Sequence, residues 1–402
     1  APVKRSKRTP QLVRGMKDIF PPSSNDWVTM MRAADAISES YNFEYFETPI
    51  LEDAALFTRT LGKTSDVVSK EMYIFEDKDG SKLALRPEVT AAAARSYINS
   101  GMVNMSQPVK LWYFGPMFRH NRPQAGRYRQ FHQFGCETMG VHDPSVDAEL
   151  ITVAYNYIRD VGVESIVHIN SIGTPDDRER YVVELVGYLR SKRSYLSEES
   201  KKRITKNPLR VLDSKDEQDQ EVIADAPQII DWLSDSSKNH LMSVLEYLDE
   251  AEVPYVLKPT LVRGLDYYTD TVFEIFPEGD GKGSQSALGG GGRYNLLVEQ
   301  LGGQPTPGAG FSIGIERVLL VLNRKKAQEI EAQALADAEG EQEFKKTERK
   351  PAVFFAHLGE PSRKRALGLI EQLRREGIFV RHCLGKSSLK GQLELADKHG
   401  VT

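Results

Sequence analysis

Four arginines lie close together between two aromatic segments of the chain. The segment from Leu111 to Glu137 reads LWYFGPMFRHNRPQAGRYRQFHQFGCE, with Pro123 and Gly126 near its middle. Because proline and glycine favour tight turns, two strands joined by a loop are predicted here. Several guanidinium groups on one loop are suited to hold a polyphosphate, while a solvated basic hairpin is the alternative. The four residues are Arg119, Arg122, Arg127 and Arg129.

The second strand of this hairpin carries polar side chains on one face. Since side chains alternate along a strand, Gln133, Gly135 and Glu137 share a face with Phe131. Gly135 would leave a notch between the two polar side chains, where a small ligand could approach the sheet. Unpaired polar groups on the inner face of a sheet are costly, so we interpret this face as the wall of a ligand pocket.

Two further segments combine charged residues with turn-forming or aromatic ones. In the segment RPEVT, residues 86–90, Pro87 is expected to open a helix with Glu88 and Thr90 in its first turn, as an ordinary helix start also would. The segment VRGLDYYTDTVFEI, residues 262–275, leads into an expected strand and forms a polar patch on an otherwise apolar stretch. Its candidate functional residues are Arg263, Tyr267 and Tyr268.

Glycine-rich segments follow in the second half of the chain. Residues 289–292 are four consecutive glycines, which would let the backbone lie flat against a ring or a ribose; a structured turn is predicted and a flexible loop is the alternative. Residues 308–322, GAGFSIGIERVLLVL, predict a strand, a tight turn and an apolar helix with Arg317 near its start. The spacing between Gly310 and Gly314 does not match a dinucleotide-binding fingerprint, and no phosphate-binding loop motif occurs. Polyphosphate binding would therefore depend on arginine side chains.

The surrounding sequence predicts a mixture of helices and strands. Hydrophobic residues at helical spacing follow Asp26, which is expected to cap the first helix. Aromatic and β-branched runs bounded by glycine or proline indicate strands. We predict helices over 26–40, 145–161 and most of 175–252, and strands over 43–46, 165–172, 254–257, 268–276 and 287–295.

A change of composition marks a domain boundary near the end of the chain. Residues 323–350 are rich in Ala, Glu, Gln and Lys, which predicts a charged helical linker. A strand–helix–strand–helix series follows, and because two parallel strands make a poor sheet, this series is interpreted as part of a domain. The predicted organisation is 1–174, 175–252, 253–322, 323–350 and 351–402.

Composition excludes several classes of protein. The chain has 402 residues, of which 40% are hydrophobic, and this length fits two or three folded domains. Its formal net charge is −4, so nucleic acid would have to be bound through a local basic face. Cys136 and Cys383 lack the spacing of a disulfide framework or a zinc site. Without an apolar run long enough to span a membrane, or a signal-peptide core, a cytoplasmic location is expected.

Together the motifs resemble those of class II aminoacyl-tRNA synthetases, and most closely the histidyl-tRNA synthetases. Residues 26–57 are similar to motif 1, the arginine hairpin to motif 2, and GFSIGIERVLLVL to motif 3; VRGLDYYTDTVFEI and GGGRYN are similar to the two histidine-specific motifs. The resemblance implies an α+β fold: an antiparallel sheet with flanking helices, a helical insertion at 175–252 and a partial α/β anticodon-binding domain at 351–402. It also implies a homodimer formed through motif 1.

The resemblance implies that arginines bind ATP. Arg119 and Arg263 would contact the α-phosphate, and Arg317 the γ-phosphate. Gln133 would lie near the substrate carboxylate that attacks the α-phosphorus. Fixed guanidinium groups can stabilise the charge that develops in this step without reorganising, which would make Arg119 and Arg263 catalytic. Mg²⁺ would bridge the remaining phosphates and neutralise the leaving pyrophosphate; no residues are assigned to a metal.

The resemblance also implies a binding site for L-histidine. Glu88 and Thr90 would hold its α-amino group, while Glu137 and Tyr268 would address the two imidazole nitrogens and Tyr267 would shape the pocket. Neutral imidazole carries one donor and one acceptor, which a carboxylate and a phenol can satisfy together. The implied activity is formation of histidyl-adenylate and transfer of histidine to tRNA(His), with release of AMP and pyrophosphate.

Two alternatives belong to other classes of function. One is a catalytically inactive, synthetase-like regulatory subunit of ATP phosphoribosyltransferase, and the other is a catalytic-domain fragment that acts as a nucleic-acid or signalling module. The presence of Arg119, Arg263 and Arg317 favours the enzyme. One departure from the family pattern is Asn295, which follows GGRY where the family usually has Asp; we expect it to have little effect.

Overall fold

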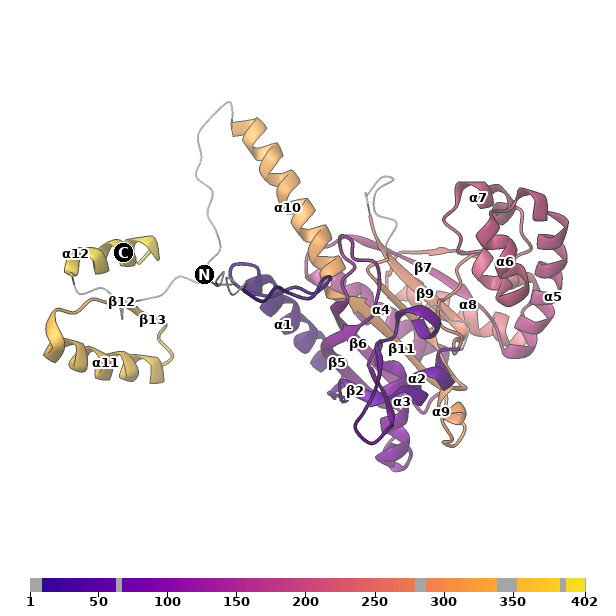
Figure 1. The fold of residues 1–402 in the computed structure, drawn as a ribbon, viewed down its shortest axis with the longest axis horizontal. Helices are drawn as coiled ribbons and strands as arrows, with labels where there is room; N and C mark the ends of the chain where they lie inside the picture. The colour runs from indigo at the N-terminus through magenta and orange to yellow at the C-terminus, as the bar shows by residue number, and fades with distance from the viewer. Residues whose placement is uncertain (1–8, 63–66, 279–286, 338–352, 384–387, 402) are drawn as a thin grey trace, which may run out of the picture. The chain divides into compact units, whose positions relative to one another are not determined.

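The structure of the chain is a computed structural model that describes residues 9–62, 67–278, 287–337, 353–383 and 388–401. The chain divides into two compact units, Ala1–Glu329 and Ile330–Thr402. The expected α+β class is confirmed, because a large sheet in the first unit is flanked by helices (Figure 1). None of the helices in the described ranges combines the length and apolar character required to cross a membrane.

In the described part of the chain, eight strands form the main sheet, in the order β1-β5-β6-β11-β10-β9-β7-β8. Its centre is antiparallel, as expected, whereas the outer pairs β1–β5 and β7–β8 are parallel. The strand bounds are β1 Glu44–Tyr45, β5 Val109–Phe118, β6 Gln130–Met139, β7 Ser165–Ser171, β8 Tyr255–Leu257, β9 Thr269–Pro277, β10 Gly289–Arg293 and β11 Gly308–Gly314.

Two hydrophobic clusters cover the two faces of this sheet, because strand side chains alternate between them. One cluster joins the helices α1 (Ser24–Ser40), α4 (Pro144–Asp160) and α8 (Asp235–Glu250) to the sheet. Its centre is Phe134 of β6, whose ring packs against Tyr157 at 4.5 Å and Phe311 at 5.6 Å between centroids. This cluster fixes the strands from behind, so that the opposite face is free to present polar groups.

The second cluster contains shorter elements that surround the polar face. The helices are α2 (Ala54–Thr60), α3 (Thr90–Asn99) and α9 (Leu297–Gln300), and a small antiparallel sheet has the order β2-β4-β3. Its strands are β2 Leu51–Asp53, β3 Ile74–Glu76 and β4 Lys82–Leu85, and a helical turn covers Val67–Glu71. Four consecutive alanines on α3, Ala91–Ala94, are fully buried. Their small side chains allow α3 to lie close to its neighbours and bring Thr90 to the sheet.

The predicted helical region 175–252 consists of helices joined by 3₁₀ turns (Figure 1). It comprises α5 (Pro175–Ser191), α6 (Glu198–Lys206), α7 (Glu217–Ala224) and α8, with turns at Arg193–Tyr195, Pro208–Val211 and Ile229–Trp232. Thr174 and Asp177 form a capping box at the start of α5. The last helix, α8, packs in the core behind the main sheet. It therefore links this region to the strands of the sheet.

The second unit contains the predicted strand–helix–strand–helix series. Its elements are β12 (Val353–Phe355), α11 (Gly359–Arg375), β13 (Val380–His382) and α12 (Leu389–Lys398), and β12 pairs with β13 in parallel. The helix α10 (Ile315–Asp337) continues well into the predicted linker, whose remaining residues 338–350 lie outside the described ranges.

Three local predictions are wrong. The first helix begins at Ser24, so Asp26 lies in its first turn and is not its cap. The helix after Pro87 begins only at Thr90. The four glycines lie in β10, which confirms the strand predicted over 287–295, and not in the structured turn predicted at 289–292, because the neighbours β9 and β11 supply hydrogen bonds on both sides.

Replacement of Phe134 by alanine should lower the free energy of unfolding of the first unit. The side chain is fully buried among aromatic rings, and loss of a buried phenyl ring typically costs about 3–5 kcal/mol. Urea unfolding monitored by circular dichroism measures the change. Phe20→Ala is the control, since Phe20 is 63% exposed, and equal stability of the two variants would contradict this account of the core.

Candidate active site

A cavity of about 440 Å³ lies over the polar face of the main sheet in the first unit. Strands β6, β9, β10 and β11 contribute to its wall, together with the start of α3 and of α10. The structure brings together residues predicted from four separate segments of the sequence. The predicted residues that line the cavity are Glu88, Thr90, Arg119, Gln133, Arg263, Tyr267, Tyr268 and Arg317.

Three buried polar atoms in this cavity wall have no hydrogen-bond partner among the described residues. They are Glu88 Oε2, Gln133 Oε1 and Arg263 Nε. Buried polar atoms are nearly always paired in folded proteins, so unpaired ones at the wall of a cavity indicate that a ligand pairs with them. The set offers two acceptors and one donor, which suits a ligand with both a cationic and an anionic group.

Arg119 is held in place by the backbone next to α3. Its Nε donates to Pro87 O at 2.9 Å, and its guanidinium lies 5.3 Å from the centre of the Phe131 ring. Burial lowers the pKa of Arg119, while Glu71 and Glu88 oppose this change. The group is therefore anchored through one nitrogen, and its outer nitrogens remain available to a ligand.

Arg263 lies over the glycine strand β10. A Cβ atom at Gly290 would come within 2.9 Å of Arg263 Nη1, so glycine is required for this side chain to approach the sheet. The same nitrogen pairs with Glu274 of β9, and the guanidinium lies 5.4 Å from the centre of the Tyr268 ring. Burial lowers the pKa of Arg263, but Tyr268 and Glu274 raise it more, so it stays above its usual value.

Arg317 completes the group of cations. Its Nη1 donates to Ala287 O at 2.6 Å. Burial, followed by repulsion from Arg127 and Arg119, lowers the pKa of Arg317 to about 10. Like charges gathered in a cavity repel one another, and a bound anion would remove this repulsion. The electrostatics therefore favour a polyanionic ligand.

Glu316 fixes the start of α10 and with it the position of Arg317. Its carboxylate accepts the His132 backbone N–H at 3.0 Å and lies 3.1 Å from His132 Nδ1. Neither Glu316 nor His132 was predicted from the sequence as a site residue. The position of Glu316 directly before Arg317 could have indicated it.

Glu137 lies beneath the cavity and is fully buried. Thr90 donates to its Oε1 at 2.7 Å, and Tyr294 donates to its Oε2 at 2.6 Å. Gly310 lines the cavity next to this carboxylate, and a Cβ atom at this position would overlap Glu137 Oε2, so only glycine leaves room for it. Burial raises the pKa of Glu137 to about 8, despite the hydrogen bonds from Tyr294 and Thr90, which lower it.

The expected notch at Gly135 is occupied. A Cβ atom at Gly135 would lie 2.4 Å from the Tyr113 hydroxyl, so the aromatic side chain of the neighbouring strand fills the space. The notch prediction is therefore wrong, because Tyr113 on the paired strand β5 fills the space opposite Gly135. Tyr113 and Tyr294 are both buried beside Glu137, and only their positions in the folded sheet reveal this.

Comparison with known proteins gives a consistent result. The model of the histidyl-tRNA synthetase family matches residues 15–174 and 186–318. The chain is 43% identical to a histidine--tRNA ligase of Halothermothrix orenii over 391 residues, which are 97% of this chain and 89% of that protein. It is 44% identical to one of Rubrobacter xylanophilus over 377 residues, covering 94% and 84% of the two chains. The chain belongs to the histidyl-tRNA synthetase family.

Solved structures agree with this assignment. The crystal structure of apo S. aureus histidyl-tRNA synthetase is similar with a TM-score of 0.77 at 34% identity, covering 98% of this chain and 90% of that one. A Bacillus halodurans structure described as an ATP phosphoribosyltransferase regulatory subunit/histidyl-tRNA synthetase has a TM-score of 0.63 at 21% identity. The match covers 95% of this chain and 95% of that one. At that identity it shows a shared fold only.

The high pKa of Glu137 predicts how the stability of this synthetase-family chain depends on pH. Between about pH 5 and pH 8 the folded protein retains a proton on Glu137 that the unfolded chain, with a pKa near 4.5, has released. Relative to Glu137→Gln, the wild type should therefore lose roughly 1.4 kcal/mol of unfolding free energy per pH unit as pH rises through this range.

Urea unfolding of both proteins at pH 5.5, 6.5 and 7.5 measures this difference. Glu179→Gln, an exposed substitution on α5, is the matched control and should unfold in parallel with the wild type. A constant difference between wild type and Glu137→Gln would show that Glu137 is already ionised throughout this range.

Proposed function

We propose that this chain activates L-histidine with ATP and transfers it to tRNA(His). An oxygen of the histidine carboxylate attacks the α-phosphorus, and the bond to pyrophosphate breaks to give histidyl-adenylate. A hydroxyl of the terminal tRNA ribose then attacks the carbonyl carbon, and AMP leaves. The observation that carries the proposal is the arrangement of Arg119, Arg263 and Arg317 around one cavity that also contains unpaired acceptor atoms.

The arginines support the activation step through fixed positive charge. Arg119 and Arg263 are assigned to the α-phosphate and Arg317 to the γ-phosphate. Each is anchored before any ligand binds, through Pro87 O, Glu274 and Ala287 O respectively. Preorganised groups stabilise charge that develops in the transition state without having to rearrange, so Arg119 and Arg263 are the proposed catalytic residues.

The neighbouring acceptors support the binding of the amino acid. The unpaired Glu88 Oε2 suits an α-ammonium group, with Thr90 beside it, and Gln133, which lines the same cavity, is assigned to the region of the carboxylate. Glu137 and Tyr268 are assigned to the imidazole, with Tyr267 next to them. Thr90 and Tyr294 already donate to the two Glu137 oxygens. Because Thr90 also lines the cavity, it is suited to transmit the hydrogen-bonding preference of Glu137 to a bound ligand.

Mg²⁺ is assigned to the nucleotide and not to a protein site. Among the described residues, no group of three or more His, Cys, Asp or Glu side chains is placed to hold a metal ion. Two of the acids that line the cavity are already paired, Glu274 with Arg263 and Glu316 with His132. The residues therefore do not fit a resident metal, and Mg²⁺ would enter as part of the ATP complex.

Contact with tRNA is supported by basic side chains at the cavity. Arg127 of the hairpin loop and Arg210 and Lys215 of the helical region line it together with the catalytic arginines. A local basic surface can attract a phosphate backbone even though the net charge of the chain is −4.

Both cysteines, Cys136 and Cys383, are buried thiols, which agrees with a cytoplasmic location.

Substitution of Arg263 by alanine tests the proposed activity. With ATP, Mg²⁺ and L-histidine, the wild type should exchange labelled pyrophosphate into ATP, and no other amino acid should replace histidine. Arg263→Ala should reduce exchange by roughly 10²–10³-fold, because a fixed donor to the developing charge is lost. Histidine binding, measured by calorimetry, should change little.

Arg159→Ala is the matched control, because Arg159 is exposed and pairs only with the adjacent surface residue Asp160 among the described contacts. It should retain full exchange. Equal loss of exchange and histidine binding in Arg263→Ala would contradict the assignment of Arg263 to the activation step, and absence of histidine-dependent exchange by the wild type would refute the function.

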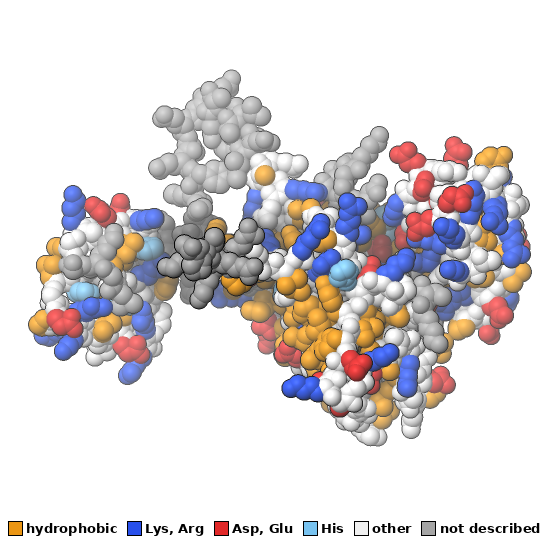
Figure 2. Space-filling view, in the orientation of Figure 1, with side chains coloured by type: hydrophobic (Ala, Val, Ile, Leu, Met, Phe, Trp, Pro, Cys, Tyr) orange, Lys and Arg blue, Asp and Glu red, His pale blue; other side chains and the backbone are white. Residues whose placement is uncertain are grey.

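We further propose that the chain forms a homodimer through the region of motif 1. Large apolar side chains are exposed on three of its elements, and Figure 2 shows hydrophobic side chains gathered over the part of the first unit that holds β2 and β5. Contiguous exposed apolar surface of this kind is typical of protein interfaces. The exposed residues of motif 1 are Val28, Met31, Tyr45, Ile50 and Leu51, and Ile74 and Phe75 are exposed on β3 in the same small sheet as β2.

Phe75→Glu should convert the dimer to a monomer. Phe75 lies on the edge strand β3 and is 43% exposed, so a carboxylate there would be buried on association without a partner. Sedimentation velocity at micromolar concentration measures the state. Val183→Glu on α5, where Val183 is 72% exposed, is the control and should remain dimeric. A monomeric wild type would refute the dimer.

A further inference from the structure

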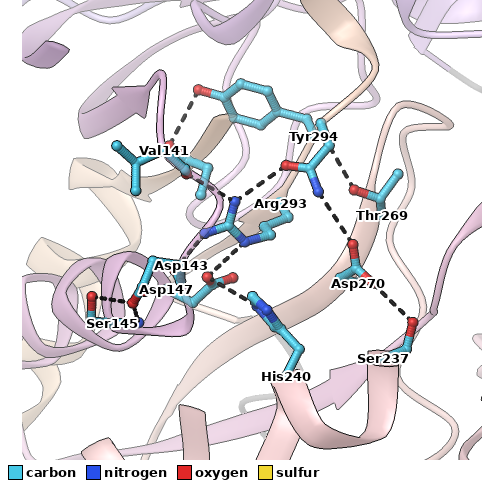
Figure 3. A network of polar contacts seen from close by, with 12 residues as sticks. Val141, Asp143, Ser145, Asp147, Ser237, His240, Thr269, Asp270, Arg293 and Tyr294 are labelled. Atoms are coloured by element: carbon cyan, nitrogen blue, oxygen red, sulfur yellow. Dashed lines mark hydrogen bonds and ion pairs between the residues drawn. The ribbon is translucent and has the colours of Figure 1, made fainter. Parts of the chain in front are cut away.

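A second buried polar cluster lies beside the cavity and is centred on Arg293 at the end of β10 (Figure 3). Arg293 is fully buried, and its Nε donates to Asp147 Oδ2 at 2.7 Å while its Nη2 donates to Asp143 O at 2.7 Å. His240 Nε2 lies 3.3 Å from the same Asp147 oxygen. A buried charge requires such partners, so the end of β10 is fixed to α4.

Strand β9 bulges where it passes Arg293. Gly292 pairs with Val272, but Arg293 pairs with Thr269, so Asp270 and its neighbour are left outside the regular register. Asp270 has a φ of 44°, a left-handed conformation that is uncommon outside glycine, although Asp and Asn adopt it more readily than other residues. Strained backbone of this kind persists only where surrounding contacts determine it, and it is concentrated at functional sites.

The Asp270 side chain is held from two sides. Asn295 Nδ2 donates to its Oδ2 at 3.3 Å, and Ser237 of α8 donates to its Oδ1 at 3.2 Å. Asn295 Oδ1 in turn accepts from Arg293 Nη1 at 3.2 Å. The amide of Asn295 therefore joins a buried cation to a carboxylate, which requires one acceptor and one donor on the same side chain.

This arrangement explains why an amide stands at position 295. A carboxylate there would still accept from Arg293, but it would place an oxygen where Nδ2 now lies, 3.3 Å from Asp270 Oδ2. Two carboxylates at that distance repel each other. An acid at position 295 would therefore be destabilised by Asp270 in this chain.

The network controls residues of the adjoining cavity. Tyr294 follows Arg293 directly, and its hydroxyl donates to Glu137 Oε2 at 2.6 Å. Tyr268 is two residues before the strained Asp270 and lines the cavity. The rings of Tyr267 and Tyr294 meet edge to face at 5.9 Å. Movement of the start of β9 would displace Tyr268, and movement of the end of β10 would displace Tyr294. Both phenols are next to the proposed imidazole site.

We propose that Asn295 and Asp270 form a compensating pair of positioning residues for histidine recognition. Together with Arg293 they hold the ends of β9 and β10 so that Tyr268 and Tyr294 keep their places around Glu137. The inference rests on the proposed function, since histidine is the ligand whose recognition it describes.

Asn295→Asp tests the pair in the full-length protein. The Michaelis constant for histidine in pyrophosphate exchange should rise by about tenfold, since coupling within a hydrogen-bond network commonly changes a binding constant by this order. The constant for ATP should stay within about twofold, because the arginines are anchored outside the network. A purely structural defect would change both constants and would lower the melting temperature in proportion.

The double variant Asp270→Asn/Asn295→Asp exchanges the two groups. It restores a donor opposite an acceptor and keeps an acceptor for Arg293, so histidine affinity should return to near the wild-type value. Asn295→Leu is a second single variant, which removes both hydrogen bonds without adding a charge and should also weaken histidine selectively. Asn239→Asp, the same chemical change on the exposed face of α8, is the matched control and should leave both constants unchanged.

An unchanged histidine constant in Asn295→Asp or Asn295→Leu would overturn the inference, as would failure of the double variant to recover. These results are distinct from failure of the proposed function. If wild-type protein shows no histidine-dependent exchange, the function itself is refuted. If the wild type exchanges and only the variants fail to respond, the positioning pair alone is refuted.

Discussion

Guanidinium groups that repel one another must be held apart over the polar face of the main sheet. Three arginines share one cavity with little solvent to screen them, and the lowered pKa of Arg317 reflects burial and the charge of Arg127 and Arg119. The fold holds them by giving each a separate anchor in a different element. The same clustered positive charge would give favourable interaction energy with a bound polyphosphate.

The glycines of the central strands follow from the same constraint. At Gly290 the absence of a side chain lets Arg263 lie on the sheet, and at Gly310 it makes room for the Glu137 carboxylate underneath. Strands rich in glycine are weak by themselves. Here β10 and β11 are stabilised by neighbours on both edges and by the aromatic cluster behind them, so the stability of the site comes from the opposite face of the sheet.

The proposed amino-acid site would rely on a different electrostatic arrangement. Its central acid, Glu137, is buried without a cation and is therefore held neutral up to about pH 8. A neutral acid surrounded by hydroxyl groups can exchange donor and acceptor roles, which suits a ring that carries one of each. Separation of a cationic pocket from a neutral polar one within a single cavity would allow the two proposed substrates, ATP and histidine, to be distinguished by charge before they are distinguished by shape.

Local periodicity and turn chemistry can be taken from the residues alone. They indicate most of the helices and strands, and they place Phe131, Gln133 and Glu137 on one face of a strand. Only the tertiary structure decided what surrounds them. Thr90 and Tyr294 reach Glu137 from 47 and 157 positions away in the chain, and Tyr113 closes the space beside Gly135 from the adjacent strand. Such pairings are set by strand order and register, which the period of a single segment does not encode.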